Sequence, residues 1–235
     1  MNRVDLHVRW LDRMEFARAV ALQEEIVLAK RDHRSVEDQL LLLEHEPVYT
    51  IGRTPDRSSL TTRRTTERIR RGELSPTHLP HPLFTINRGG QATYHGPGQL
   101  IGYPIIDLHQ CGQDLHKYLR WLEQLLIDLL AEYGIAASRR ASLTGVWVDD
   151  RKIASIGVGV RHWITMHGFA LNVCGDLSPF NHIEPCGIKN VTMTSMEGET
   201  GAAFSVAAVA ASLEKLALDQ IAELRVIREA QAINV

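Results

Sequence analysis

Two residues of this sequence have the types and surroundings suited to covalent chemistry: Cys186 and Lys152. Cys186 lies in Pro185-Cys186-Gly187, and proline and glycine on either side are typical of a tight turn that presents a thiol at a surface. Lys152 directly precedes Ile153-Ala154-Ser155-Ile156-Gly157, whose small residues would let a substrate lie along a strand. A lysine held near a cysteine stabilises the thiolate, which is the nucleophilic form. The two residues are therefore candidates for a nucleophile and its partner.

Each candidate also has a simpler interpretation. A free cysteine is most often a small buried apolar residue, which suits Cys174, at the end of an apolar run, better than Cys186. Cys111 follows His109-Gln110 at an expected loop, and its neighbours give little indication of a chemical role. Lysines at turns are usually solvated, so Lys152 has a structural interpretation too. His95 is a candidate base or hydrogen-bond donor, and equally a structural histidine.

A glycine-rich stretch, residues 88–99, is a candidate wall for a small-molecule pocket. It reads Arg-Gly-Gly-Gln-Ala-Thr-Tyr-His-Gly-Pro-Gly-Gln and holds four of the chain's 17 glycines. Glycine lets the backbone approach a ligand closely, and proline between two glycines gives a stiff bend. Apolar, strand-like runs flank the stretch at 83–86 and 100–108. We expect a pocket wall bearing hydrogen-bonding side chains; the alternative is an ordinary hairpin connection.

Composition and motifs argue against several other classes of function. The 235 residues carry a net charge of −2 with acidic and basic residues mixed, so no nucleic-acid partner is predicted. The sequence lacks the phosphate-binding glycine motifs and the Gly-x-Ser-x-Gly motif of hydrolases. Its 11 histidines and 3 cysteines are dispersed, which predicts neither a metal site nor a disulfide framework. No signal peptide and no run of about 18 apolar residues is visible, so we expect no membrane span and a cytoplasmic location.

Hydrophobic periodicity predicts helices interspersed among strands. Strands are expected at 4–10, 39–44, 83–86, 100–108, 145–148, 153–158 and 163–173, and helices at 16–30, 115–133 and 206–227, the last as one helix or two. The hairpin of 145–148 with 153–158 argues against a purely parallel sheet. We therefore predict an α/β (α+β) fold with a mixed β-sheet and flanking helices. The segment 54–80 is expected to be a mobile surface loop with a short helix near 67–70.

Five sequence blocks together resemble the lipoyl(octanoyl) transferase family. They are residues 88–99, His45-Glu-x-Pro-Val-Tyr-Thr-x-Gly52, Lys152-Ile-Ala-Ser-Ile-Gly157, His167-Gly-Phe-Ala-Leu-Asn172 and Pro185-Cys186-Gly187. They occur in the family's order and cover roughly residues 4–220, whereas 54–80 matches no block. The resemblance implies a fold like the catalytic domain of biotin and lipoate protein ligases, with residues 1–235 as a single catalytic domain.

The resemblance also implies roles for individual residues. Cys186 would form an acyl-thioester, and Lys152 would activate it and shuttle protons. The implied acyl pocket is lined by Arg88, Gly89, Gly90, Gln91, Ala92, Thr93, Tyr94, His95, Ser155, Ile156, Gly157, Gly168, Phe169 and Ala170. Backbone amides at Gly187 and around Gly89 are candidates for stabilising the oxyanion.

The implied donor is octanoyl-acyl carrier protein. The implied acceptors are the lipoyl domains of 2-oxoacid dehydrogenase E2 subunits and the glycine cleavage H protein. No cofactor or metal is expected, because the donor is already activated. The runner-up is an ATP-dependent lipoate or biotin ligase of the related fold, which would not need Cys186. A non-enzymatic acyl-binding module is a more distant alternative, and a cysteine hydrolase would expect a histidine partner in place of Lys152.

Overall fold

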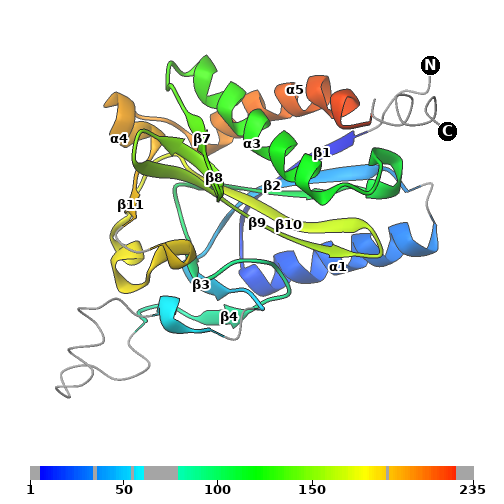
Figure 1. Cartoon of the computed structure of the whole chain (residues 1–235), viewed down its shortest axis with the longest axis horizontal. Helices are drawn as coiled ribbons and strands as arrows, with labels where there is room; N and C mark the ends of the chain where they lie inside the picture. Colours follow the sequence, from blue (N-terminus) through cyan, green and yellow to red (C-terminus); the bar gives the residue numbers. More distant parts are fainter. Residues whose placement is uncertain (1–5, 34–35, 54–55, 61–78, 189–190, 226–235) are drawn as a thin grey trace.

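The computed structural model describes residues 6–33, 36–53, 56–60, 79–188 and 191–225. These residues form two β-sheets, with α-helices on both faces of the larger one (Figure 1). Helices α3 and α5 lie on one face and α1 on the other. The helices are α1 (Phe16–Asp32), α3 (Leu115–Glu132), α4 (Met196–Thr200) and α5 (Val206–Arg225).

The larger sheet is mixed. Its strand order is β1-β2-β6-β10-β9-β8-β7, and a short strand β11 pairs with β9. Strands β1 and β2 are parallel, whereas β2-β6, β6-β10, β10-β9, β9-β8 and β8-β7 are antiparallel. The strands are β1 (Leu6–Met14), β2 (Asp38–His45), β6 (Gln99–Ile105), β7 (Ser138–Arg140), β8 (Leu143–Val148), β9 (Arg151–Arg161), β10 (Ile164–Asn172) and β11 (Thr192–Met193).

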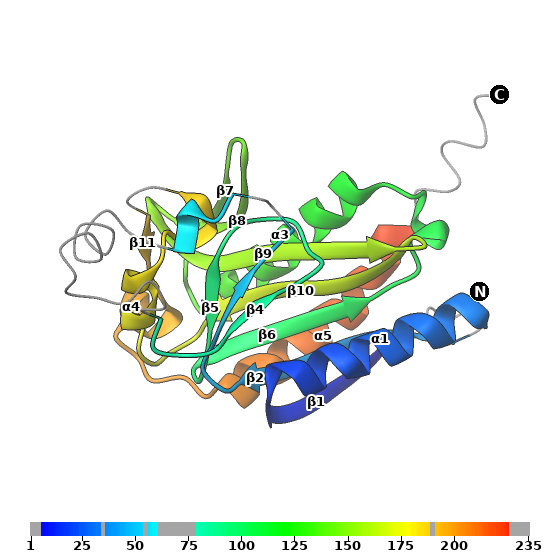
Figure 2. The ribbon, with the colours of Figure 1, turned by 90° about the horizontal axis from the view of Figure 1, so that it is seen from below.

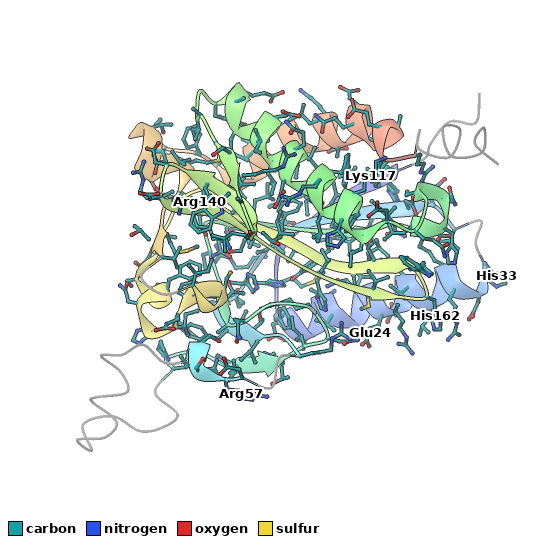
Figure 3. All side chains as sticks on the ribbon, in the orientation of Figure 1. Glu24, His33, Arg57, Lys117, Arg140 and His162 are labelled. Carbon is teal, nitrogen blue, oxygen red and sulfur yellow. The ribbon has the colours of Figure 1, made fainter. Side chains whose placement is uncertain are left out.

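Alternation along β2 divides the core between the two faces of this sheet. Leu40 and Leu42 join the cluster covered by α3 and α5, whereas Leu41 and Leu43 join the cluster covered by α1. A continuous leucine run is what a strand buried on both faces requires. Seen from below, α1 crosses in front of β2 and β6 (Figure 2). Polar residues occupy the outer sides of the helices, such as Glu24 on α1 and Lys117 on α3 (Figure 3).

A smaller sheet covers one end of the larger one and carries part of the glycine-rich stretch. Its order is β4-β3-β5, with β3 (Val48–Ile51) between β4 (Leu83–Thr85) and β5 (Thr93–His95). Pro47 lies between the end of β2 and the start of β3, where the chain passes from the larger sheet to the smaller one. Strand β5 lies inside the stretch 88–99, which is therefore more than a connection between two flanking strands.

The predicted fold class is confirmed, and most elements lie within a few residues of their expected ends. The helix expected at 206–227 is a single helix as far as Arg225. The strand expected at 100–108 ends at Ile105, because Leu108 begins a 3-10 turn, η2 (Leu108–Cys111). Residues 61–78, including the helix expected near 67–70, lie outside the described residues. Within the described part of the chain, no helix has the length and apolar character needed to cross a membrane.

Candidate functional site

Cys186 lies in a tight turn that is tied to the glycine-rich stretch. The 3-10 turn η4 (Pro185–Gly187) carries it, and its φ of 57° falls in the left-handed region that residues other than glycine rarely adopt. The amide of Cys186 donates a hydrogen bond to the carbonyl of Ala92 at 2.8 Å. This bond fixes the turn against the residue that precedes β5.

Lys152 lies beside this thiol. Its Nζ is 3.3 Å from Sγ of Cys186 and donates to the carbonyl of Thr144 at 3.1 Å. The same ammonium lies 5.3 Å from the ring centroid of Trp147, within cation–π range. Lys152 is only 1% exposed because it lies inside β9 rather than at the hairpin tip. The interpretation of Lys152 as a solvated turn residue is therefore wrong.

A β-bulge in β9 brings Lys152 and Ser155 to the same side of the strand. The pairing of β8 with β9 shifts by one residue between Lys152 and Ala154. In a regular strand, residues three apart point to opposite faces. Here Ile153 and Ala154 both enter the core beneath α3 and α5, while Ser155 Oγ lies 3.8 Å from Sγ of Cys186. Bulges often re-aim a side chain in this way.

Ser59 links the Cys186 turn to the glycine-rich stretch. Its carbonyl accepts a hydrogen bond from the amide of Glu184 at 2.8 Å. Its hydroxyl accepts from the amide of Ala92 at 3.1 Å and donates to Oε1 of Gln91 at 3.0 Å. Ser59 is buried and belongs to the segment 54–80, to which the sequence assigned no role. A serine in a polar segment carries no signal by which this contact could be found.

A pocket, which we call the inner pocket, extends from Cys186 into the space between strands β9 and β10 of the larger sheet and strand β5 of the smaller sheet. It encloses about 420 Å³ of space between protein atoms, part of it open to solvent. Its lining consists of Phe16, Ile86, Arg88, Thr93, His95, Tyr103, Ser155, Ile156, Gly157, His167, Gly168, Phe169, Ala170 and Cys186.

Small residues on two paired strands make room for this pocket. Ser155 of β9 pairs with Ala170 of β10, and Gly157 pairs with Gly168. None of these four side chains extends beyond one heavy atom past Cβ. Because Ser155 lies next to Cys186, the register orders the pocket from the thiol towards Gly157 and Gly168.

The other end of the inner pocket is aromatic. The ring of His167, which precedes Gly168 in β10, lies 6.4 Å from that of Tyr103. The ring of Phe16 is stacked 6.4 Å from that of His95. His167 has a φ of 57°, and its amide donates to the buried side chain of Gln23 on α1 at 2.8 Å. These four rings form the aromatic end of the inner pocket.

Three histidines at this end are held uncharged. Burial lowers the pKa of His45 to about 4 and that of His167 to about 4, and it lowers the pKa of His95 well below 6.5. Nδ1 of His45 lies 2.9 Å from the carbonyl of Met14, which can only accept, so Nδ1 carries the proton. Nε2 of His45 therefore accepts from the hydroxyl of Tyr103 at 2.6 Å.

Arg88 supplies a buried positive charge between the smaller sheet and Cys186. Its guanidinium donates to the carbonyls of Gly89 and Gln91 at 2.8 and 3.0 Å and to the hydroxyl of Thr50 at 2.9 Å. Burial lowers the pKa of Arg88, and the charge of the Cys186 thiolate opposes that shift. These three acceptors are neutral oxygens, so the charge remains available to an anionic group at Cys186.

A second depression, which we call the outer groove, meets the inner pocket at Cys186. It encloses about 880 Å³ of space between protein atoms, much of it open to solvent. Lys152 lines the outer groove and not the inner pocket. The groove is lined by Arg88, Gly89, Gly90, Gln91, Leu115, Leu119, Ser142, Leu143, Thr144, Lys152, Ile156, Gly157, Val158, Cys186 and Ile188.

Comparison with known proteins shows the family. Residues 15–216 match the family described as the lipoyl protein ligase A/B catalytic domain. The chain is 50% identical over 214 residues to the octanoyltransferase of Geobacter sulfurreducens, covering 89% of this chain and 84% of that protein. It is 45% identical over 183 residues to the octanoyltransferase of a Nostoc species, covering 78% of this chain and 77% of that one. The chain belongs to the octanoyltransferase family.

Solved structures show that the chain shares its fold with ligases. A lipoate-protein ligase A bound with ATP superposes with a TM-score of 0.63 at 14% identity, covering 92% of this chain and 85% of that one. A biotin protein ligase from Aquifex aeolicus gives 0.52 at 14% identity, covering 93% and 70%. At such low identity the likeness concerns the fold alone. Family membership makes the chain an acyltransferase.

The inner pocket and the outer groove divide the residues that the sequence assigned to one acyl pocket. The inner pocket takes Arg88, Thr93, His95, Ser155, Ile156, Gly157, Gly168, Phe169 and Ala170. Gly89, Gly90 and Gln91 line the outer groove instead. Ala92 and Tyr94 appear in neither lining. Ala92 is buried behind the Cys186 turn, and Tyr94 points into a small cluster with Phe180.

Two of the amides suggested for an oxyanion site already have partners. Gly187 donates to the carbonyl of Glu184 at 3.0 Å, and Gly89 donates to that of Val158 at 3.1 Å. Among the described residues, no group of three or more His, Cys, Asp or Glu side chains could hold a metal ion.

Four residues of the inner pocket were not predicted from the sequence: Phe16, Ile86, Tyr103 and His167. His167 is the first residue of one of the five sequence blocks, and this position was the only indication in the sequence that it could line the pocket. The other three belong to apolar runs that predicted a helix and strands, and nothing in those runs distinguishes a pocket residue from a core residue.

Proposed function

We propose that this enzyme transfers an octanoyl group from octanoyl-acyl carrier protein to a lysine of lipoyl domains through a thioester on Cys186. The observation that carries the proposal is the 3.3 Å approach of Lys152 Nζ to Cys186 Sγ where the inner pocket and outer groove meet. An amine and a thiol at this distance can share a proton, and covalent catalysis divides acyl transfer into two easier steps.

In the first step, the Cys186 thiolate attacks the carbonyl carbon of the donor. The octanoyl chain lies in the inner pocket, against the small residues of β9 and β10. The bond from the carbonyl carbon to the pantetheine sulfur breaks, and the Lys152 ammonium gives a proton to that sulfur. Arg88, whose guanidinium is buried beside Cys186, stabilises the negative charge that develops during the attack.

In the second step, the neutral Lys152 amine takes a proton from the incoming lysine ammonium. The amine so formed attacks the thioester, a carbon–nitrogen bond forms, and the carbon–sulfur bond to Cys186 breaks. The second proton of the amine is lost to water. Cys186 returns as a thiolate beside the Lys152 ammonium, so the cycle needs neither oxidant nor nucleotide.

The proposed acceptors are the lipoyl domains of 2-oxoacid dehydrogenase E2 subunits and the glycine cleavage H protein. We place the enzyme in the cytoplasm and treat residues 1–235 as one catalytic domain. The proposed site residues are Cys186 and Lys152 for catalysis and, for the acyl chain, the inner-pocket residues that the sequence predicted.

The test is mass spectrometry of the intact enzyme, first with octanoyl-acyl carrier protein and then with a lipoyl domain. We expect the enzyme to gain one octanoyl group and then lose it as the lipoyl domain gains it, with apyrase and a chelator present throughout. Transfer that stops when nucleotide is removed would favour an ATP-dependent ligase and contradict the proposal.

A further inference from the structure

The outer groove follows the open edge of β9. Strand β8 pairs with β9 as far as Ala154, and beyond that point the amide of Gly89 donates to the carbonyl of Val158 at 3.1 Å. The groove therefore lies where β8 leaves β9, among residues 142–144, the N-terminal half of α3 and residues 89–91. Val158 follows Lys152 by six residues, so the two lie about 20 Å apart along the strand at a rise of roughly 3.3 Å per residue.

Helix α3 runs along the same line. Its Glu123 accepts a hydrogen bond from the amide of Gly145, close to Lys152, whose Nζ bonds to Thr144. Leu119 and Leu115 lie one and two turns earlier on the helix, so Leu115 is about 12 Å from Glu123 along its axis. Leu115 is 36% exposed although it is a large apolar residue. The groove thus has an apolar part at Leu115 and Leu119, between the N-terminal half of α3 and residues 142–144 of the hairpin that joins β7 to β8.

We propose that the outer groove binds the pantetheine-type arm of the thioester donor, an inference that rests on the proposed function. A thioester carries its acyl chain and its thiol arm on opposite sides of the reacting carbonyl. With the acyl chain in the inner pocket, the arm must leave Cys186 through another opening, and the outer groove is the one that also contains Lys152. The ammonium that protonates the departing sulfur therefore lies on the side where that sulfur leaves.

The lining of the groove matches such an arm. Apolar side chains of Leu119, Leu143 and Val158 suit its methylene and dimethyl groups, and the polar side chains of Gln91 and Ser142 in the same lining suit its amides. The acceptor lysine has a short four-carbon stem and needs only the end of the groove beside Lys152. Leu115 and Leu119 therefore concern the donor arm and not the acceptor.

The experiment compares two donors that differ only in the arm: octanoyl-pantetheine and the octanoyl thioester of methanethiol. The measured quantity is the ratio of their kcat/KM values for octanoylation of Cys186. Leu119→Trp fills the groove and Leu115→Ser removes apolar lining from an exposed position. We expect each to lower the ratio, Leu119→Trp by on the order of ten-fold.

Leu218→Trp is the matched control, because Leu218 is 45% exposed on α5 and lines neither depression; it leaves the ratio unchanged. If Leu119→Trp and Leu115→Ser slow both donors equally, the groove does not bind the arm. If loading is preserved but transfer from preloaded enzyme to the lipoyl domain slows, the groove belongs to the acceptor. Failure of wild-type enzyme to form a Cys186 thioester with either donor would instead overturn the proposed function itself.

Discussion

The hydroxyl of Ser59 accepts a hydrogen bond from the amide of Ala92, whose own carbonyl accepts one from the amide of Cys186. Ser59 is thereby a positioning residue for the thiol, although it lines neither the inner pocket nor the outer groove itself. We expect Ser59→Ala to lower the rate of Cys186 octanoylation by about ten-fold while the melting temperature falls by about 4–8 °C, because two hydrogen bonds worth about 1 kcal/mol each are lost. Single-turnover loading and thermal unfolding measure the two effects.

The control for this prediction is Ser58→Ala at the adjacent position. Ser58 is exposed, and its hydroxyl bonds to Asp56 rather than to the glycine-rich stretch. It should load at the wild-type rate. Equal losses in the two variants would mean that the segment acts through general stability and not through the Cys186 turn.

Of the three cysteines, we expect Cys186 alone to be octanoylated. Burial raises the pKa of the Cys111 thiol to about 11 and also raises that of Cys174, so neither offers much thiolate at neutral pH. Peptide mapping after mixing with donor should locate the thioester on Cys186, and Cys186→Ala should take up none. Cys111→Ala and Cys174→Ala serve as controls that still load. An octanoyl group on either of those residues in the wild type would refute the assignment.

Lys152→Met should abolish transfer with little loss of the fold. Methionine is close to lysine in volume and fits the space beside Trp147 and Gly145. Without the amine, neither the departing sulfur nor the incoming ammonium has its proton partner, and general acid–base groups typically contribute a factor of about 10²–10⁴. Transfer from preloaded enzyme to the lipoyl domain should fall by at least about 100-fold. Lys117→Met, at an exposed position of α3, should not change it.

Phe16 should limit the length of the acyl chain. It lines the aromatic end of the inner pocket, opposite Cys186. Phe16→Leu leaves extra space there, so the ratio of decanoyl to octanoyl loading should rise, at a cost in stability of about 1 kcal/mol. Phe204→Leu, which alters the core beneath α3 and α5 instead, should leave the ratio unchanged. An unchanged ratio for Phe16→Leu would place the chain-length limit elsewhere.

Stability should fall as the pH drops below about 6.5. Folded His45 and His167 have pKa values of about 4, below their ordinary 6.5, so the unfolded chain binds more protons between these limits. The contribution of these neutral histidines to the free energy of unfolding is complete above pH 6.5 and is lost as the pH falls towards 4. By pH 5 the loss is about 2 kcal/mol for each histidine. Urea unfolding at pH 7.5, 6 and 5 gives the free energy of unfolding at each pH. This free energy should fall less steeply with decreasing pH in His45→Gln and His167→Gln than in the wild type. His116→Gln, at an exposed position, should keep the wild-type slope.

Local patterns were sufficient for the elements and for part of the site. The leucine run of β2 and the periodicity of α3 predicted both elements, since each depends on burial of a face. The tight turn at Cys186 followed from its proline and glycine neighbours. The bulge in β9 could not be predicted, because it depends on pairing with β8 rather than on any residue in the strand. For the same reason residues 88–95 were predicted to form one pocket wall. In the structure they are divided between the inner pocket, the outer groove and a small core cluster.

Gly157 is a better position than Gly90 for a substitution that tests the pocket wall. Gly90 has a φ of 89°, so Gly90→Val would strain the backbone whatever its effect on the substrate. Gly157 has an ordinary φ, and an added Cβ would lie 3.0 Å from the Arg88 side chain. Gly157→Ala therefore probes the wall between the inner pocket and Arg88 with less disturbance of the fold.

The two halves of the catalytic pair differ in how they are anchored. Ile153 and Ala154, which follow Lys152, are fully buried in the main core, so their amide protons should exchange with solvent only when the whole molecule unfolds. The Cys186 turn is held by a few hydrogen bonds to Ala92 and Ser59, and its amides should exchange through local opening. The enzyme would then keep its proton carrier stationary while its thiol adjusts by small movements to a free, attacked or acylated state. Hydrogen exchange would register this as slower exchange at the amides of Ile153 and Ala154 than at that of Cys186, although Nζ of Lys152 lies only 3.3 Å from Sγ of Cys186.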